Sequence, residues 1–411
     1  MSVDDSGHNI ALYTKQAEAG NPAAQYGLGL LLFAGVQGPG DRAKAIEWWE
    51  KAAAGGSPEA QFMLGQCSQF STGRPQDLRQ AANWYEKAAQ GGHQQARLNI
   101  ASMLLSGTGV AKDESKACAW LKAAAEDGFD KAAVALGRLY EEGVGTAVNA
   151  DQALHWFSMA AETGNSEGQY SLALMYLNGK AVDRNEALAA EWFTKAAQQG
   201  YSLAEFELAR CYLLGKGVSQ DHGRALDWFA RAAAKGHAPA EYQIGLMYAN
   251  GLGVTRDLEK FRRHLTNAAD AGLVTAQLLL GSMLYQGAGA GMERDPREAV
   301  RWLSKAAERG VQQAQFLAGL IYLNELKDYH AAFRWNREAA LQKSAEAQYN
   351  LGYQFANGLG VVEDRDQALE WYRSCHDLAR TDPNRAEIAE KSAYAIEQLR
   401  KETSRANPAP G

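Results

Sequence analysis

Large apolar residues, small residues and polar residues follow one another along this chain in an order that recurs every 36 residues. Six tryptophans mark the period, each 36 residues after the one before: Trp48, Trp84, Trp120, Trp156, Trp192 and Trp228. His264 stands in the next slot, and the series resumes at Trp302, Trp335 and Trp371 after an insertion of two residues and a deletion of three. A repeat of this length is typical of proteins that stack supersecondary units instead of closing one central core.

Each tryptophan lies in a predicted helix, which we call helix B. Seven residues before it stands Asp or Asn, as Asp41 precedes Trp48, and these residues cap helices by accepting backbone N–H groups of the first turn. Alanines follow the tryptophan by four and five residues, so the cap, the alanines and the tryptophan share one face at helical spacing. The pattern predicts that the tryptophans are core residues. Helix B is expected to end at a glycine such as Gly56, which supplies a left-handed turn.

A second helix, helix A, is predicted between each of these glycines and the next helix B. It carries a Leu or Ile followed by a small residue, as in Leu64-Gly65, and a large residue four positions after the Leu slot, such as Tyr140. Small residues beside large ones let two helices approach closely and interdigitate. Glycine-rich turns such as GTGV at 107–110 then lead back to helix B.

The order of these segments resembles the SEL-one-like repeat, a relative of the tetratricopeptide repeat. The residues that carry the resemblance are AEAG and AAQ with LG, followed by GxGV, D, A, W and KAA. The clearest copies are residues 162–197 and 234–254. The resemblance implies an all-α, right-handed α-solenoid or superhelix of about ten helix-turn-helix repeats. We expect a capping helix over residues 1–19, ten repeats forming one solenoid domain over 20–379, a second capping helix over 380–404, and a disordered tail over 405–411.

Composition and charge exclude several classes of protein. The net charge of −6 and the lack of a stripe of Lys and Arg argue against binding to nucleic acid. No apolar run is long enough to insert into a membrane, and the first residues lack the basic and apolar regions of a signal peptide. The four cysteines form no CxxC pair, so reduced thiols in the cytoplasm are expected; a periplasmic or secreted location is the alternative if a signal peptide was removed. A monomer is expected.

The chain contains no sequence motif of an enzyme, a metal site or a phosphate-binding loop. We therefore expect no catalytic residues, no metal and no cofactor. His264 is interpreted as a tolerated substitution in the tryptophan slot, with a functional histidine as the alternative. The basic cluster around it, which includes Arg262 and Arg263, is interpreted as a solvated face rather than a site for an acidic partner.

Residues of helix A that are not used for packing are predicted to line the concave side, by resemblance to tetratricopeptide arrays. They mix aromatic, aliphatic and amide side chains, which suit an extended or helical peptide. The predicted partner-binding residues are Tyr170, Leu174, Asn178, Phe206, Arg210, Tyr242, Leu246, Asn250, Tyr349, Tyr353 and Asn357. Two alternatives stay open: the tyrosines and Phe206 pack against the next repeat, and the asparagines only finish helix A.

A repeat array with a groove and no reactive cluster predicts a non-enzymatic scaffold or adaptor that binds a partner protein or peptide. The resemblance implies the same adaptor work, because members of the family assemble protein complexes. The alternative is a dedicated inhibitor, immunity or regulatory protein that neutralises one specific enzyme. A repeat alone does not choose between them, because a fold does not determine a function.

Overall fold

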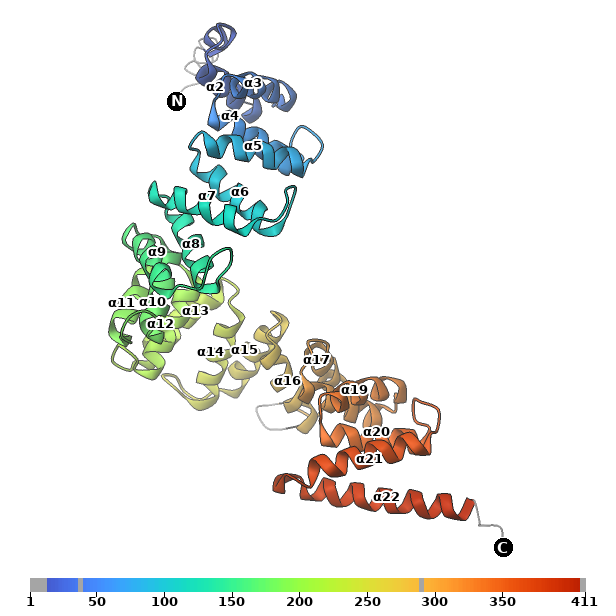
Figure 1. Ribbon diagram of the computed structural model, residues 1–411. Coiled ribbons are helices and arrows are strands. Elements are labelled where there is room, and N and C mark those ends of the chain that lie inside the picture. The colour runs from blue at the N-terminus through green and yellow to red at the C-terminus, as the bar shows by residue number, and fades with distance from the viewer. Residues whose placement is uncertain (1–12, 36–39, 288–291, 407–411) are drawn as a thin grey trace. The chain divides into compact units, whose positions relative to one another are not determined.

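The computed structural model describes residues 13–35, 40–287 and 292–406, and within these ranges every regular element is a helix. The helices alternate between helix A and helix B in the predicted order (Figure 1). The helices A are α2 (Pro22–Ala34), α4 (Pro58–Gln69), α6 (Gln94–Ser106), α8 (Asp130–Glu142), α10 (Ser166–Asn178), α12 (Ser202–Leu214), α14 (Ala238–Asn250), α16 (Val274–Gln286), α18 (Gln312–Ile321) and α20 (Ala345–Asn357). The helices B are α3 (Arg42–Ala54), α5 (Leu78–Gln90), α7 (Glu114–Glu126), α9 (Ala150–Glu162), α11 (Glu186–Gln198), α13 (His222–Ala234), α15 (Leu258–Asp270), α17 (Pro296–Glu308), α19 (Tyr329–Leu341) and α21 (Arg365–Ala379).

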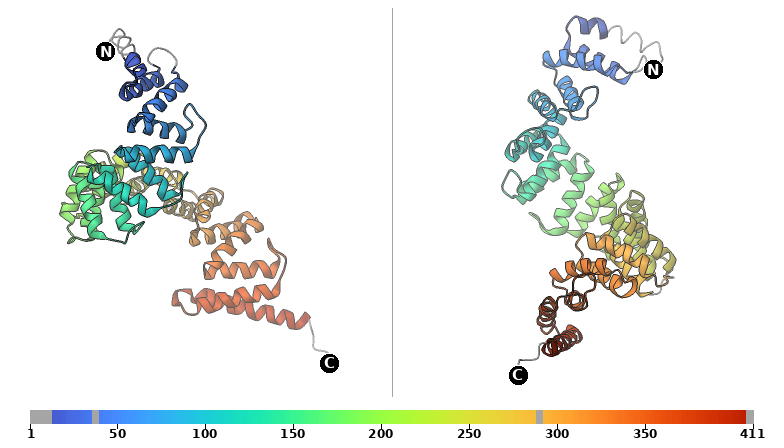
Figure 2. Two further views of the ribbon diagram at one scale, coloured as in Figure 1. Left: turned by 45° about the horizontal axis from the view of Figure 1, so that its top comes forward. Right: turned by 90° about the vertical axis from the view of Figure 1, so that its right-hand side faces the viewer.

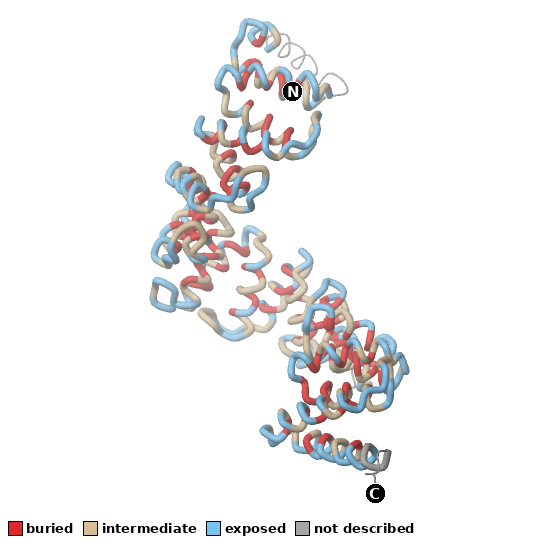
Figure 3. The backbone as a smooth tube through the Cα atoms, turned by 45° about the vertical axis from the view of Figure 1, so that its right-hand side comes forward, coloured by how far each residue is buried: buried red, intermediate tan, exposed pale blue. Residues whose placement is uncertain are grey.

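The chain folds as two compact units. The first comprises Met1–Cys211 and Gly215–Ser219, and the second comprises Tyr212–Leu214 and Gln220–Gly411. Within each unit, consecutive helices lie side by side as stacked hairpins (Figure 2). Buried residues gather where neighbouring helices meet, while the turns are mostly exposed (Figure 3). Each unit is therefore a segment of an all-α repeat solenoid, as predicted.

The predicted helix ends are present. Asp113 accepts a hydrogen bond from the Lys116 backbone N–H at 2.9 Å, and the same cap recurs at most helices B. Gly128, which follows helix B, has a φ of +82° with open space around it. Gly109, in the turn back to helix B, has a φ of +73° and also lies against the backbone of Leu78, so it is needed for both conformation and space.

The structure corrects the predicted burial of the tryptophans. Three indoles are buried, at Trp156, Trp302 and Trp335, whereas those of Trp48, Trp84, Trp120, Trp192, Trp228 and Trp371 are partly exposed. The next residue is buried in every repeat, in the order Trp49, Tyr85, Leu121, Phe157, Phe193, Phe229, Leu265, Leu303, Asn336 and Tyr372. Adjacent helical positions are about 100° apart, so only one of the two can point directly at helix A.

Several of the partly exposed indoles are covered by a basic side chain three residues later. The Lys51 ammonium lies 4.0 Å from the ring centroid of Trp48, and that of Lys195 lies 3.6 Å from the ring of Trp192. These contacts combine a cation–π attraction with coverage by the aliphatic stem of the lysine. These partly exposed tryptophans therefore border the core and solvent, whereas Trp156, Trp302 and Trp335 are part of the core.

Small residues in helix A make room for the buried side chain that comes directly after the tryptophan slot. A Cβ atom on Gly65 would lie 2.6 Å from ring atoms of Tyr85, and one on Gly352 would lie 2.8 Å from the ring of Tyr372. The Leu-small pairs are thus confirmed as close-packing positions, although the residue that they face is the neighbour of the tryptophan.

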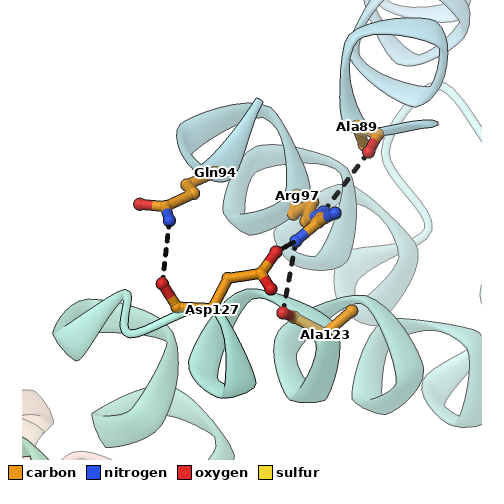
Figure 4. Close-up of polar contacts among 5 residues, drawn as sticks. All are labelled: Ala89, Gln94, Arg97, Ala123 and Asp127. Carbon is orange, nitrogen blue, oxygen red and sulfur yellow. Dashed lines mark hydrogen bonds and ion pairs between the residues drawn. The ribbon is translucent and has the colours of Figure 1, made fainter. Parts of the chain in front are cut away.

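Polar side chains connect most helices A to the helix B before them. Gln277 donates its amide to the carbonyl oxygen eight residues earlier at 3.0 Å, and glutamines at equivalent positions of other repeats do the same. In the third repeat Arg97 takes this place, donating to the carbonyl of Ala89 at 3.3 Å and to that of Ala123 at 3.2 Å (Figure 4). Its guanidinium also pairs with Asp127, so one side chain joins three consecutive helices.

Both ends of the array carry helices outside the repeat. Residues 13–18 are helical, and the rest of the expected N-terminal cap, residues 1–12, lies outside the described residues. At the other end a short 3₁₀ helix (Pro383–Arg385) leads into α22 (Ala386–Ala406), which packs on α21 and α20. Residues 407–411 of the expected tail also lie outside the described residues. Where repeat nine lacks the glycine-rich turn, α18 continues into one turn of π-helix (Tyr322–Leu326).

Candidate protein-binding face

Helix α8 and helix α10 enclose a hollow on the side of the helices A in the first unit. It has a volume of about 260 Å³ and is lined by Arg138, Glu141, Tyr170, Ser171, Leu174, Met175, Asn178 and Lys180. Three of the predicted partner-binding residues are therefore brought together at one concave place. A hollow of this size accepts one bulky apolar side chain rather than a cofactor, since ligand pockets usually start at about 300 Å³.

Tyr170 forms one wall of the hollow and is held by other aromatic rings. Its ring centroid lies 5.8 Å from that of Phe193 and 5.4 Å from that of Tyr201. Burial, reinforced by the nearby carboxylate of Glu207, raises the pKa of the Tyr170 hydroxyl. Tyr170 thus packs against the next repeat, as the alternative interpretation predicted, and still contributes a face to the hollow.

Ion pairs border the hollow. Lys180 Nζ lies 2.8 Å from a carboxylate oxygen of Glu141, and Arg138 pairs with Glu167 at the start of α10. All four side chains are substantially exposed, so each pair contributes little to stability. The pairs instead leave the border with no net charge, which favours an uncharged segment over a strongly acidic or basic one.

The two predicted residues of α12 contact each other on their own helix. Arg210 donates to both carboxylate oxygens of Glu207 at 2.9 Å, and its guanidinium carbon lies 6.0 Å from the ring centroid of Phe206. The positive charge of Arg210 is therefore matched by Glu207 on the same turn.

In the second unit, Tyr242 and Leu246 of α14 are half-buried against the core that contains Phe261 and Leu265. The side-chain amide of Asn250 donates to the carbonyl oxygen of Leu246 at 2.9 Å. Asn250 therefore closes the last turn of its own helix, which supports the interpretation that the asparagines finish helix A.

Helix α20 carries the remaining predicted residues in two different environments. Tyr349 lies 5.4 Å from Tyr372, centroid to centroid, and packs with residues of α21 and α22, so it belongs to the C-terminal core. Tyr353 is 43% exposed, and its carbonyl accepts the amide of Asn357 at 2.8 Å. Of the two tyrosines, Tyr353 is the one exposed to solvent.

Two further residues of the helices A were not predicted from the sequence. Both stand ten positions after the glycine that ends helix B. Arg138 and Leu320 occupy that position after Gly128 and Gly310, as Leu174 does after Gly164. None of the three is buried. Comparing this one position across all repeats would have revealed them.

His264 has specific partners. Its Nδ1 lies 2.6 Å from a carboxylate oxygen of Glu241, and its ring stacks on Tyr248 at 5.7 Å with an angle of 7°. Nearby, the Arg256 Nε donates to the carbonyl of Ala249 at 3.1 Å. His264, which stands in the tryptophan slot of repeat seven, is thus part of a polar cluster.

The described part of the chain holds no group of three or more His, Cys, Asp or Glu residues that could bind a metal ion. No helix among the described residues has the length and hydropathy needed to cross a bilayer.

The fold defines a repeat protein of stacked helical hairpins, with a hollow between two helices A of the first unit. A model of the Sel1 repeat matches ten consecutive segments, at residues 22–57, 58–93, 94–129, 130–165, 166–201, 202–237, 238–273, 274–311, 312–344 and 345–374. The chain belongs to the Sel1 repeat family.

Solved and curated relatives agree with this assignment. The crystal structure of a protective antigen of uropathogenic Escherichia coli, which displays an SLR fold, is 33% identical with a TM-score of 0.66, over 90% of this chain and 79% of that one. The ERAD-associated E3 ubiquitin-protein ligase component HRD3 of Candida glabrata is 36% identical over 74 residues, which are 18% of this chain and 9% of that protein. Chitin synthase regulatory factor 3 of Schizosaccharomyces pombe is 30% identical over 93 residues, which are 21% and 10%. The chain thus spans about a tenth of the length of these two curated relatives.

Proposed function

We propose that this chain is a non-enzymatic scaffold or adaptor that binds partner polypeptides through its helices A. The observation that carries the proposal is the hollow between α8 and α10, where Tyr170, Leu174 and Asn178 meet. Sel1 repeats are protein-interaction repeats, and the names of both curated relatives describe a complex component and a regulatory factor.

The test is affinity capture with the full chain, followed by mass spectrometry, comparing the original sequence with Leu174→Asp. Leu174 is only partly buried and lines the hollow, so its replacement is expected to spare the fold. Val148→Asp is the matched control, because Val148 is 69% exposed in a turn of the same unit. Loss of the captured partner with Leu174→Asp but not with Val148→Asp is expected. If all three proteins capture the partner equally, the helix-A face is not the binding surface, which contradicts the proposal.

The second candidate function is regulation of one specific enzyme, including its inhibition. The name of the Schizosaccharomyces pombe relative favours it, because that protein is called a regulatory factor of chitin synthase. The distinction rests on the captured partner: if it is an enzyme, its turnover is measured while purified chain is added. A saturable change in turnover at equal molar amounts supports regulation, and unchanged turnover of a bound enzyme supports a scaffold.

A further inference from the structure

His93 fills a position at which three other repeats cap their helix A with an uncharged oxygen. It is the N-cap of α6, and its Nδ1 accepts a hydrogen bond from the backbone N–H of Ala96 at 3.1 Å. Ser57, Asn165 and Ser344 hold the same position before α4, α10 and α20 and accept the equivalent bond through a side-chain oxygen. Such an oxygen accepts at any ordinary pH, whereas an imidazole nitrogen accepts only while it carries no proton.

The ring of His93 also connects two repeats. It stacks on Phe62 of α4, with centroids 4.3 Å apart and an angle of 18°, and Phe62 in turn packs against the buried ring of Tyr85. The start of α6, in repeat three, is thereby held to the core of repeat two. Arg97, one turn further along α6, makes a second connection, because it donates to the carbonyl oxygen of Ala89 at the end of α5 (Figure 4). We call these two contacts the joint between repeats two and three.

We propose that His93 makes the joint between repeats two and three sensitive to acid. With a proton on Nδ1 the ring has no acceptor left, so the N–H of Ala96 loses its partner and α6 loses its cap. The added positive charge would also stand at the N-terminus of a helix, where the helix dipole disfavours it. Arg97 lies in the turn that His93 caps, since its N–H donates to the His93 carbonyl at 3.1 Å, so a loosened turn weakens its contact with α5. This property belongs to the array itself and does not depend on the adaptor function.

The charged groups around the ring do not reverse this effect. Burial lowers the pKa of the His93 ring from its usual value of 6.5, and the carboxylate of Glu59 on α4 offsets this only in part. On α5 the Lys87 ammonium lies over an indole ring, 4.7 Å from its centroid, and Arg97 of α6 pairs with Asp127 after α7. Since the folded state binds this proton less readily than the unfolded chain, the stability of the joint is fully present above pH 6.5 and decreases as the pH falls below it.

The experiment measures hydrogen exchange of the full chain at about pH 7.5 and about pH 5.5, a range in which histidines titrate while most Asp and Glu side chains stay ionised. Rates at amides of the first two turns of α6 are corrected for the intrinsic effect of pH. The main variant is His93→Asn, which supplies the oxygen cap that repeat five has at Asn165. His237→Asn is the matched control, because His237 holds the same position before α14 in the second unit and makes no side-chain cap bond.

The original chain is expected to exchange at these amides at least about threefold faster at the lower pH. His93→Asn should abolish that increase, whereas His237→Asn should leave it unchanged. His93→Ala has no cap at either pH, so its exchange should be fast at both values. This last variant separates the loss of a cap from the loss of a proton-binding group.

Two results would overturn the inference. One is an original chain whose exchange in α6 does not rise in acid, and the other is an equal rise in His93→Asn. If His93→Asn is unstable at both pH values, His93→Ser takes its place, because Ser57 and Ser344 fill this position elsewhere. Titration of the His93 ring by NMR in the original chain gives a second measurement: protonation below pH 6.5 supports the inference, and protonation at or above that value contradicts it.

Discussion

Replacing Gly65 by alanine adds a single methyl group to α4 at a place where a buried ring leaves no room. In an exposed helix this change would raise the free energy of unfolding by about 1 kcal/mol. Here the new Cβ would lie 2.6 Å from both Cδ1 and Cε1 of Tyr85, which is fully buried. The ring is also held by its hydroxyl, which donates to Gln69 Oε1 at 2.6 Å.

The expected magnitude is the balance of two opposing effects. An extra methyl group in a packed core costs about 1–3 kcal/mol, and the gain in helix propensity returns about 1 kcal/mol. We therefore expect Gly65→Ala to lower the free energy of unfolding by about 1 kcal/mol, which is opposite in sign to the effect of helix propensity alone. Tyr85→Leu alone should cost about 2–4 kcal/mol, because it leaves a cavity and removes a hydrogen bond.

The third repeat supplies the compensated pair, since Ala101 and Leu121 stand where the second repeat has Gly65 and Tyr85. The double variant Gly65→Ala with Tyr85→Leu should therefore be more stable than the sum of the two single effects by about 2 kcal/mol. Urea unfolding followed by circular dichroism measures the totals. Hydrogen exchange at amides of α4 and α5 locates the effect, because repeat arrays need not unfold in one step. A stabilising Gly65→Ala, or strictly additive effects, would refute the packing argument, and Ala101→Gly serves as the propensity control.

Three further predictions concern the turns and the thiols. Gly109→Ala should destabilise the first unit more than Gly128→Ala in urea unfolding, because both have positive φ but only Gly109 also meets the backbone of Leu78; equal losses would contradict this. Ala181→Gly should raise the free energy of unfolding by about 1 kcal/mol, because Ala181 has a φ of +57°, and a loss would show that its methyl group is needed. Burial raises the pKa of the Cys375 thiol from 9.0 to about 11, so this thiol should react slowly with a thiol reagent at neutral pH until the protein unfolds. The contribution of the buried, protonated thiol to the free energy of unfolding is present below pH 9 and should be lost as the pH rises toward 11.

The sequence predicted the helices well because each boundary depends on local chemistry. Asp113 and Gly128 act through their own turns, so their roles can be inferred from spacing alone. The mistaken burial of the tryptophans has a different origin. Trp192 and Phe193 are both large and adjacent, and only the path of the neighbouring helix A decides which of them is buried. Periodicity identifies the buried face of a helix to within about one residue. In this chain a shift of one residue is the difference between a core side chain and one that borders solvent.

The candidate site was predicted in part for the same reason. Positions in helix A that avoid helix B can be inferred from the repeat, which is why Leu174 and Tyr353 lie at partly exposed places. Whether a tyrosine there is free depends on the helices that come next in the array, and Tyr349 is covered because α22 packs after α21. The asparagines illustrate a local alternative that the structure supports, since Asn250 and Asn357 bond back to their own helices. The single domain over residues 20–379 and the partner-binding role of these residues stay predictions.

The distribution of charge along the second unit follows the packing of the repeat. Helices B alternate with helices A in the chain, yet α17 has five charged residues while α16 and α18 have none. Helix α18 contacts the helices A on both sides, α16 and α20, as well as the helices B next to it, so less of its surface is left for charged side chains. The same scarcity of charge is found in α2, which has no charged residue, and in α14, which has one, so it belongs to helix A as an element of the repeat and does not by itself mark a binding surface.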